Sequence, residues 1–441
     1  MPTFLDKLCA AVQLCDGGDE SDRFLIRRSV ADTLGVAAAG FLEPVTRHAL
    51  KAYGGTAATT WSGELCESSE AAVMVDAIAA HALDFDDVFL ESATHSSTVI
   101  VPAVLRYEGQ YEPDEIIASI GAGLIAARAI TSYVGYGHYH KGWHATGTIG
   151  AFAAAAALGR LYKLTEGELR ACFALAASLS GGLKINFSTQ AKPCHAGFAA
   201  AAGMRAARLA AAGVDGAPNV FLGPGGYREL YGVGDGKDLL DDAMFQLRPD
   251  GLSLKLFPCC YASHRLIGLA LAARSDLGPT FAANKATVKL TVPARSIEVL
   301  RYDRPTNGLE AKFSGPYCVA VALLDGIPTL SHFTNDAARR PDLNELMTRI
   351  EIIEDPTQNS RGDIEFGDVT LEIRGSSGET IFRHSRKAIP GSPKEPPSRS
   401  ALAAKLNSCL SLFAGSYGRR LPILDRYETT LNIGQWFDCG A

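Results

Sequence analysis

Histidine is the side chain whose ordinary pKa lies closest to neutral pH, and the histidines of this chain are grouped. The sequence has 10 histidines in 441 residues. Seven of them lie in four short segments: His81 and His95; His138, His140 and His144; His195; and His264. A lysine, Lys192, precedes His195 closely. Imidazole and amine groups gathered in this way predict proton transfer or the binding of anions.

The stretch HALDFDDVFLESATHSS, residues 81–97, adds carboxylates to these histidines. Acidic groups beside a histidine can hold a metal, form an acid/base pair or simply solvate a loop. The spacing contains neither a D-x-D-x-D-G calcium loop nor an HxxxH or HExxH pair. The adjacent cysteines Cys259 and Cys260 suit one zinc ion poorly. We therefore expect no metal.

Three of the basic residues stand at the start of an alanine-rich helical pattern. His95 precedes a serine cap in ATHSSTVIVPAVLR, His144 precedes Thr146 in KGWHATGTIG, and Lys192 precedes Pro193. His264, in the first turn after Ser263, is a weaker fourth case. A helix N-terminus carries roughly half a positive charge and free N–H donors, so it attracts carboxylates and disfavours a proton on a nearby base. Several such ends together would form a pocket for a small polyanion with bases inside it.

Each of these residues also has a simpler structural interpretation. A single histidine in a helical protein is more often a hydrogen-bonded structural residue than a catalyst, and Lys192 alone would be a solvated residue at a helix start. His195, in a first helical turn, fits a structural or supporting role, and Lys255 and Lys312 fit surface charges as well as anion ligands. The functional interpretation depends on the grouping.

The elements that must position these groups are mostly helices. Apolar residues recur with helical spacing over residues 24–40, 68–83, 113–130, 165–179 and 195–213, several with a Ser, Thr or Asp start and a Gly stop. The many alanines and glycines allow helix axes to approach closely, so we expect a tightly packed bundle.

The pattern changes after about residue 255. Residues 285–303 and 348–356 alternate like strands, and residues 366–387 predict a hairpin around GSSG. Residues 308–326 and 342–350 look helical between them, and a helix returns at 398–415 after the linker AIPGSPKEPPSRS. We predict a mainly α fold: a large all-helical domain from residues 1–255 and 396–441, and a smaller α+β domain from 256–395.

Composition excludes several classes of function. The net charge is −6 and the pI near 6.0, which leaves no basic face for nucleic acid. No uninterrupted apolar run reaches the ~18–20 residues of a membrane helix, and Asp6 and Lys7 interrupt any secretory core. The 10 cysteines form no CxxC pair, and no GxGxxG follows a predicted strand. We expect a cytoplasmic protein that binds neither nucleic acid nor membranes.

Five segments together resemble, in order, the signature blocks of the MmgE/PrpD family. They are HALDFDD, GWHATGTIGAFAAAAALGRL, TQAKPCHAGFAAAAGMRAARLAAAG, LKLFPCCYASH and EAKFSGPYCVAVALLDG. The family contains 2-methylcitrate dehydratase, cis-aconitate decarboxylase and iminodisuccinate epimerase. The resemblance implies a helical domain built from both chain ends, a smaller α+β lid domain, a homodimer, and no metal or organic cofactor.

The blocks also imply site residues. Asp84 resembles the active-site aspartate of the HxxDFDD block, and His95 the histidine that follows it. His144 resembles the GWH histidine and Lys192 the lysine of the KPxH block. Tyr139, His264 and Tyr317 also match family motifs, and we expect Asp84, His264 and Tyr317 to bind substrate. Asp86, Asp87 and Glu91 are then expected in loop or capping roles.

The chain departs from the dehydratase and decarboxylase pattern in one block. Those members read DFDDT…HP, whereas this chain has Val88 in place of the threonine and Ser96 in place of the proline. A hydroxyl that could bind substrate is therefore absent. We expect a cofactor-free enzyme that removes a proton next to a carboxylate, an epimerase of a small dicarboxylate such as iminodisuccinate, with Lys192 and Tyr139 or a histidine as the bases and with His95 and His144 polarising carboxylates. The alternatives are a 2-methylcitrate dehydratase or cis-aconitate decarboxylase, and a non-catalytic metabolite-binding dimer.

Overall fold

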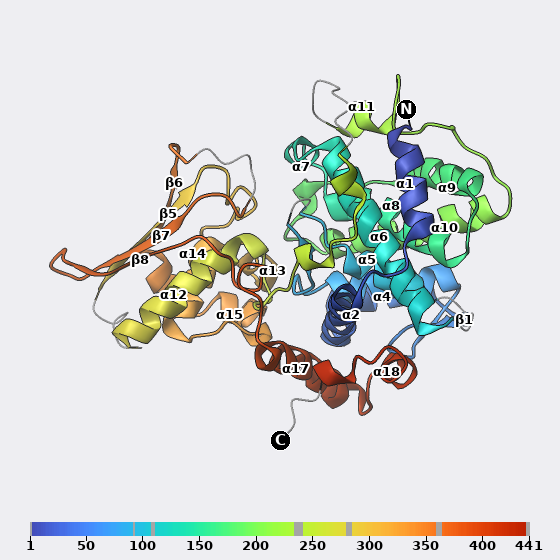
Figure 1. Cartoon of the computed structure of the whole chain (residues 1–441). Helices are drawn as coiled ribbons and strands as arrows, with labels where there is room; N and C mark the ends of the chain where they lie inside the picture. Colours follow the sequence, from blue (N-terminus) through green and yellow to red (C-terminus); the bar gives the residue numbers. More distant parts are fainter. Residues whose placement is uncertain are drawn as a thin grey trace. The chain divides into compact units, whose positions relative to one another are not determined.

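The computed structural model describes residues 2–90, 93–106, 111–232, 241–278, 285–358 and 364–437. The chain divides into two compact units (Figure 1). The larger contains residues 1–186, 190–254 and 398–441, and the smaller contains 187–189 and 255–397. The domain borders predicted from composition, at 255/256 and 395/396, lie next to these divisions.

The larger unit is built around long helices from the first half of the chain. Its helices are α1 (Phe4–Leu14), α2 (Glu20–Gly40), α3 (Pro44–Tyr53), α4 (Ser69–His81), α5 (Ser97–Leu105), α6 (Pro113–Val134), α7 (Gly137–His140), α8 (Ala145–Leu161), α9 (Glu166–Leu179), α10 (Ala191–Ala211), α11 (Tyr227–Tyr231), α17 (Arg399–Tyr417) and α18 (Pro422–Tyr427). Helix α10 packs against α4, α8 and α9, and α17 from the chain's end packs against α2. All five helices predicted in this half are confirmed.

Small residues set the helix spacing, as expected. A Cβ on Gly203 of α10 would lie 2.4 Å from Ala154 Cβ of α8, and one on Gly197 would lie 2.7 Å from the Met74 carbonyl oxygen of α4. Both distances are too short for any side chain, so these two helices approach α10 closely only because the positions are glycine. Nearly every residue of α8 is buried, which is the expected state of a helix that is apolar all round.

The prediction of an all-helical large domain is wrong. Strands β1 (Gly54–Thr59) and β2 (Leu65–Cys66) form one antiparallel pair, and β3 (Val88–Phe89) and β4 (Leu252–Ser253) form another. Period-two alternation needs about four residues to be recognised, and three of these strands have only two. The second pair also joins segments far apart in the sequence. It fixes the chain just after the DFDD residues.

The smaller unit combines one mixed sheet with short helices. Strands β5 (Thr287–Pro293), β6 (Ile350–Asp355), β7 (Val369–Arg374) and β8 (Thr380–Arg386) lie in the order β6-β5-β7-β8, with β5 parallel to β6 and antiparallel to β7. Its helices are α12 (His264–Leu277), α13 (Gly308–Ala311), α14 (Gly315–Leu324), α15 (Asn335–Ala338) and α16 (Pro341–Met347). The predicted hairpin around GSSG is confirmed as β7 and β8.

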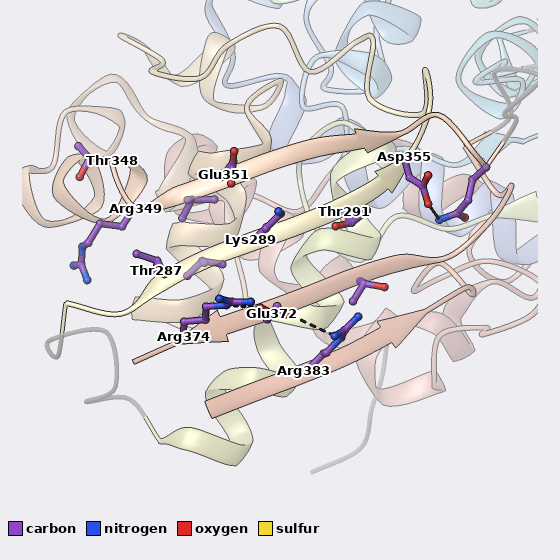
Figure 2. A pocket seen from close by; sticks show the side chains of 14 residues that line it. Thr287, Lys289, Thr291, Thr348, Arg349, Glu351, Asp355, Glu372, Arg374 and Arg383 are labelled. Carbon is purple, nitrogen blue, oxygen red and sulfur yellow. Dashed lines mark hydrogen bonds and ion pairs between the residues drawn. The ribbon is translucent and has the colours of Figure 1, made fainter. Parts of the chain in front are cut away.

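The two faces of this sheet differ because apolar and polar residues alternate along its strands. Val288, Leu290 and Leu371 point into a core shared with α12 and α14. The opposite face is polar, with a hollow of about 740 Å³ lined by residues that include Lys289, Glu372 and Arg383 (Figure 2). Glu372 there pairs with both Arg374 and Arg383.

One helix among the described residues, α6, is apolar and long enough to cross a membrane by length and composition alone. Within the structure, 89% of its most apolar window is buried. Core helices pass the same test, and its position beside α8 and α5 is that of a core helix.

Candidate active site

The grouped residues of the larger unit lie where its helices begin or end. His81 is the last residue of α4, and His144 is the N-cap of α8. Lys192 lies in the first turn of α10, which begins at Ala191, two residues before the predicted start at Pro193, so the lysine is inside the helix. Asp84 follows α4 in the left-handed region, with φ at 52°. All are buried.

Lys192 is the centre of the cluster. Its Nζ donates to Asp84 Oδ1 at 2.7 Å and to His81 Nε2 at 3.1 Å. An ammonium has only donors, so His81 Nε2 accepts and the proton of this ring lies on Nδ1. That Nδ1 donates to Asp86 Oδ2 at 2.8 Å. The ring is therefore neutral, and burial lowers the pKa of His81 to about 3, with Lys192 contributing in the same direction.

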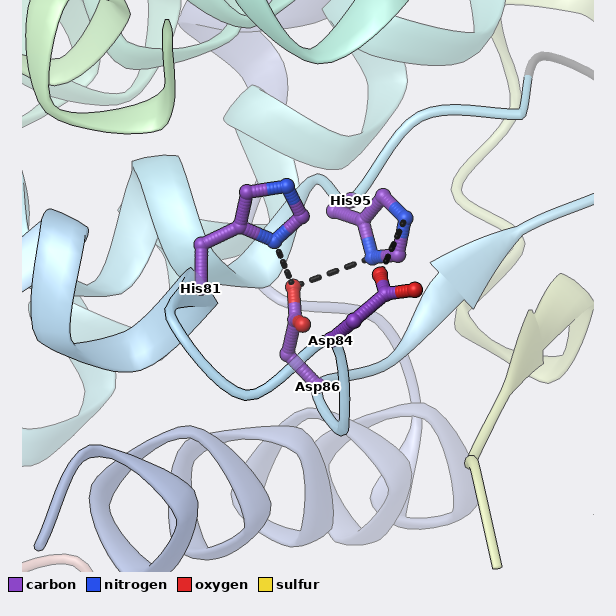
Figure 3. A group of neighbouring side chains, drawn as sticks. All are labelled: His81, Asp84, Asp86 and His95. Atoms are coloured by element: carbon purple, nitrogen blue, oxygen red, sulfur yellow. Dashed lines mark hydrogen bonds and ion pairs between the residues drawn. The ribbon is translucent and has the colours of Figure 1, made fainter. Parts of the chain in front are cut away.

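Asp86 connects two imidazole rings. Its Oδ2 lies 2.8 Å from His81 Nδ1 and 3.0 Å from His95 Nδ1, and Figure 3 shows the carboxylate between the two rings. Burial acts to raise the pKa of Asp86, but the adjoining imidazoles more than offset this, so the pKa lies well below its usual range. A permanent anion thus fixes both ring orientations. His95 Nε2 lies 3.9 Å from Asp84 Oδ1.

A second pair of imidazoles lies beside the first. His144 Nδ1 is 2.9 Å from His195 Nδ1, and the His144 ring stacks 5.8 Å from that of His81. Burial and the nearby Lys192 lower the pKa of His195 to about 4 and hold that of His144 well below its usual range. The low pKa of His144 has the direction expected for a base at a helix N-terminus, although burial is its main cause. Gly147 permits this packing, because a Cβ there would meet the Gly181 carbonyl oxygen and His195 Cβ.

The structure brings four of the predicted residues together, namely Asp84, His95, His144 and Lys192. Tyr139, on α7, has its ring 3.8 Å from Lys184 Nζ and packs against the core of the same unit. His264 and Tyr317 belong to the smaller unit. There His264 Nε2 donates to the Phe257 carbonyl oxygen at 3.2 Å. The Tyr317 hydroxyl donates to the His332 carbonyl oxygen at 2.5 Å. Their predicted roles toward substrate stay predictions.

Sequence reasoning missed or misassigned three members of the cluster. His81 received no role. Asp86 lies in the loop after α4, as predicted, but the prediction missed its complete burial between two rings. His195, left as structural or supporting, is the hydrogen-bonding partner of His144. The short spacing of five residues between His81 and Asp86 was the sequence feature that could have predicted their contact. Glu91 lies outside the described residues.

The same atoms could in principle hold a cation. One ligand atom from each of His81, Asp84, Asp86 and His95 lies within 4.8 Å of the others, and imidazole and carboxylate are ligands that zinc accepts. The Lys192 ammonium already lies against two of these residues and provides a positive charge there. The prediction of a metal-free site stays a prediction.

Comparison with known proteins gives the relationship. Residues 23–239 match the MmgE/PrpD N-terminal domain, and residues 257–426 match the MmgE/PrpD C-terminal domain. The chain belongs to the MmgE/PrpD family. The family resemblance drawn from five short motifs is thereby confirmed, and both matched domains together span most of the chain.

Several curated relatives of this MmgE/PrpD protein share one name. Cis-aconitate decarboxylase of Mus musculus is 25% identical over 392 residues, covering 83% of this chain and 80% of the relative. The Homo sapiens protein of that name is 24% identical, covering 88% and 85%, and that of Aspergillus terreus is 24% identical, covering 70% and 69%. Decarboxylases are lyases, so these names support the lyase alternative over the epimerase first expected.

Proposed function

We propose that this protein is a lyase acting on a small polycarboxylate, with decarboxylation of cis-aconitate as the leading reaction. The observation that carries this proposal is the buried Lys192–Asp84 ion pair surrounded by neutral imidazoles. An ammonium binds or protonates anions, and neutral imidazoles bind carboxylates or accept protons. The names of the relatives select this substrate among those that suit such a site.

The reaction needs one proton and a place for negative charge. In cis-aconitate the bond to the carboxylate on the methylene carbon breaks, and carbon dioxide leaves. The electron pair moves into a new double bond at that carbon and, through the adjacent alkene, onto the former vinyl carbon. That carbon takes up one proton, and the product is itaconate.

The cluster can supply both requirements. The Lys192 ammonium is the acid, and its bond to Asp84 Oδ1 at 2.7 Å holds it in place. Negative charge that develops beside the ammonium is stabilised more strongly in a buried site than in water. A ring N–H of His144 can bind a substrate carboxylate, and the lone pair of His95 can accept a proton. His195 orients the first ring and Asp86 the second.

The test is product analysis by proton NMR in deuterated water. We expect cis-aconitate to be consumed with release of carbon dioxide, and itaconate to carry one solvent deuterium at the carbon that was protonated. A panel with 2-methylcitrate and iminodisuccinate covers the other family reactions. Conversion of 2-methylcitrate to an alkene, with no turnover of cis-aconitate, would show that the reaction is dehydration and not decarboxylation.

Epimerisation of a dicarboxylate is the second candidate, and one observation favours it. Val88 stands where decarboxylating and dehydrating members carry a threonine, and its side chain is buried in β3, so the site has no hydroxyl at this position. An epimerase needs proton exchange at one carbon and no leaving group. Deuterium entering the substrate itself, without loss of carbon dioxide or water, would support it.

Two further expectations accompany the proposal. We propose that the protein is a homodimer, which light scattering on the purified protein tests. The different-class alternative is a metabolite-binding protein without catalysis. Binding of cis-aconitate with no turnover of any panel member would favour that alternative.

A further inference from the structure

A lysine near the C-terminal end of the chain, Lys405, donates a hydrogen bond to the backbone of the active-site turn at residues 84–87. Lys405 lies on α17, and its side chain is 3% exposed. Its Nζ donates to the Phe85 carbonyl oxygen at 2.8 Å and to Asp32 Oδ1 of α2 at 2.6 Å. The ammonium also lies 4.3 Å from the centre of the Phe85 ring. Three segments of the chain therefore meet at one atom.

Stability alone does not account for such a lysine. Removing two charges from water costs about as much as their attraction returns, and an apolar pair of similar size is often at least as stable. The two bonds of Lys405 also differ in kind. Asp32 neutralises the ammonium, whereas the carbonyl bond fixes the orientation of one peptide group.

That peptide group lies between the two carboxylates that organise the cluster. It joins Phe85 to Asp86, and Asp84 precedes it with φ at 52°, a conformation that non-glycine residues adopt at a cost. Asp84 and Asp86 point to different partners, Lys192 on one side and the rings of His81 and His95 on the other. If the peptide turned, both carboxylates would change direction.

We propose that Lys405 is a positioning residue of the active site, whose bond to the Phe85 carbonyl oxygen holds Asp84 against Lys192 and Asp86 against the two imidazoles. The kinetic consequence rests on the proposed function. The geometric consequence does not, because it concerns the orientation of the rings in the free protein.

Two variants separate the carbonyl bond from the ion pair. Asp32→Asn removes the counter-charge and keeps the donor to Phe85. The double variant Asp32→Asn/Lys405→Met removes both charges together, so it avoids leaving an unpaired buried ion and is expected to fold. Arg160→Met is the control, because Arg160 Nε makes a cation–carbonyl bond of the same kind, to Cys15 at 2.9 Å, at the far end of α8.

The measurements are kcat and KM, the melting temperature, and the ring ¹⁵N signals of His81 and His95 in histidine-labelled protein. We expect the double variant to lose about 10- to 100-fold in kcat, the range seen when an outer-shell partner is removed, with a small change in KM and displaced ring signals. Asp32→Asn should melt earlier and keep its kcat and ring signals. Arg160→Met should keep both as well.

Wild-type kcat and ring signals in the double variant would overturn the proposal. Equal losses in Asp32→Asn and the double variant would also overturn it, because the ion pair and not the carbonyl bond would then be responsible. If wild-type protein turns over no member of the substrate panel, the proposed function fails, and the ring signals still decide the role of Lys405.

Discussion

Two buried lysine–aspartate pairs lie on either side of the same turn and differ in what surrounds them. Lys192 and Asp84 are 2.7 Å apart and face the imidazoles of His81 and His95. Lys405 and Asp32 are 2.6 Å apart and face a carbonyl oxygen and an aromatic ring. The first pair has groups beside it that can exchange protons, whereas the carbonyl oxygen and the phenyl ring beside the second pair cannot. The two pairs have nearly the same geometry, so the groups around them, and not the ion pair itself, distinguish the proposed catalytic lysine from the proposed positioning lysine.

The largest contrast is expected between the two aspartates. Asp84→Asn leaves Lys192 without its counter-charge beside the substrate, and kcat should fall by about 1,000-fold, in the range of removing one partner from an acid/base set. Asp32→Asn should leave kcat within about threefold, although it destabilises the protein by unpairing a buried lysine. Steady-state kinetics on cis-aconitate measures both. Similar losses in the two variants would remove the distinction between the pairs.

The neighbouring carboxyls Asp86 and Asp87 are expected to differ in their effect on kcat. Asp86→Asn removes the anion that orients two rings, and kcat should fall by about 100-fold, as expected for loss of an orienting partner. Asp87 accepts from the Ser97 hydroxyl at 2.5 Å, whereas the ion pairs of His81 and His95 are with Asp84 and Asp86, so Asp87→Asn should change kcat little. If Asp87→Asn proves the more damaging, Asp86 is not the orienting group.

Asp87 also predicts a pH dependence of stability. Burial raises the pKa of Asp87 to about 8, with the Ser97 bond acting against this rise. A carboxyl whose pKa is raised on folding contributes stability that is complete below the unfolded pKa near 3.9 and is lost as pH rises through 8. Asp87→Asn does not titrate, so relative to wild type it should gain up to about 1.4 kcal/mol for each pH unit between 4 and 8.

Urea unfolding of both proteins at pH 5 and pH 7.5 measures this gain. The difference in unfolding free energy between variant and wild type should shift in favour of the variant at the higher pH. An equal difference at the two pH values would show that Asp87 has an ordinary pKa in the folded protein.

The smallest effect concerns the imidazoles themselves. Because burial lowers the pKa of His81 to about 3 and that of His195 to about 4, their ring ¹⁵N signals should not change between pH 5 and 8. In urea-unfolded protein the same rings should titrate near 6.5. Titration of either ring above pH 5.5 in the folded protein would mean that the site is wetter or more acidic than the structure indicates.

The sequence predicted the helices far better than the short strands. Regular apolar spacing over α4, α6 and α10 follows from burial of one or more faces, so the pattern is local and readable. Strands β3 and β4 have two residues each, and Val88 of β3 pairs with Ser253 of β4, which lies far along the chain. Their stability comes from tertiary pairing, which leaves no periodic trace.

The candidate site was also predicted only in part. Lys192, Asp84, His95 and His144 lie in motifs that resemble a known family, and the structure brings them together. The burial of Asp86 was not predicted, because an acidic run usually solvates a loop, whereas here α4 ends inside the core and buries the run. Lys405 had no signal at all, since it reaches Phe85 across 320 residues of sequence.

Incubation of wild-type and Lys192→Met protein with cis-aconitate in deuterated water tests the central claim most directly. The buried Lys192 is held to be the acid of a cofactor-free reaction, so wild type should form itaconate with one deuterium, and the variant should be slower by about 1,000-fold. Lys163→Met, which removes an exposed lysine paired with Glu115, should match wild type. Equal rates for Lys192→Met and wild type, or turnover that depends on stoichiometric bound metal, would contradict the account.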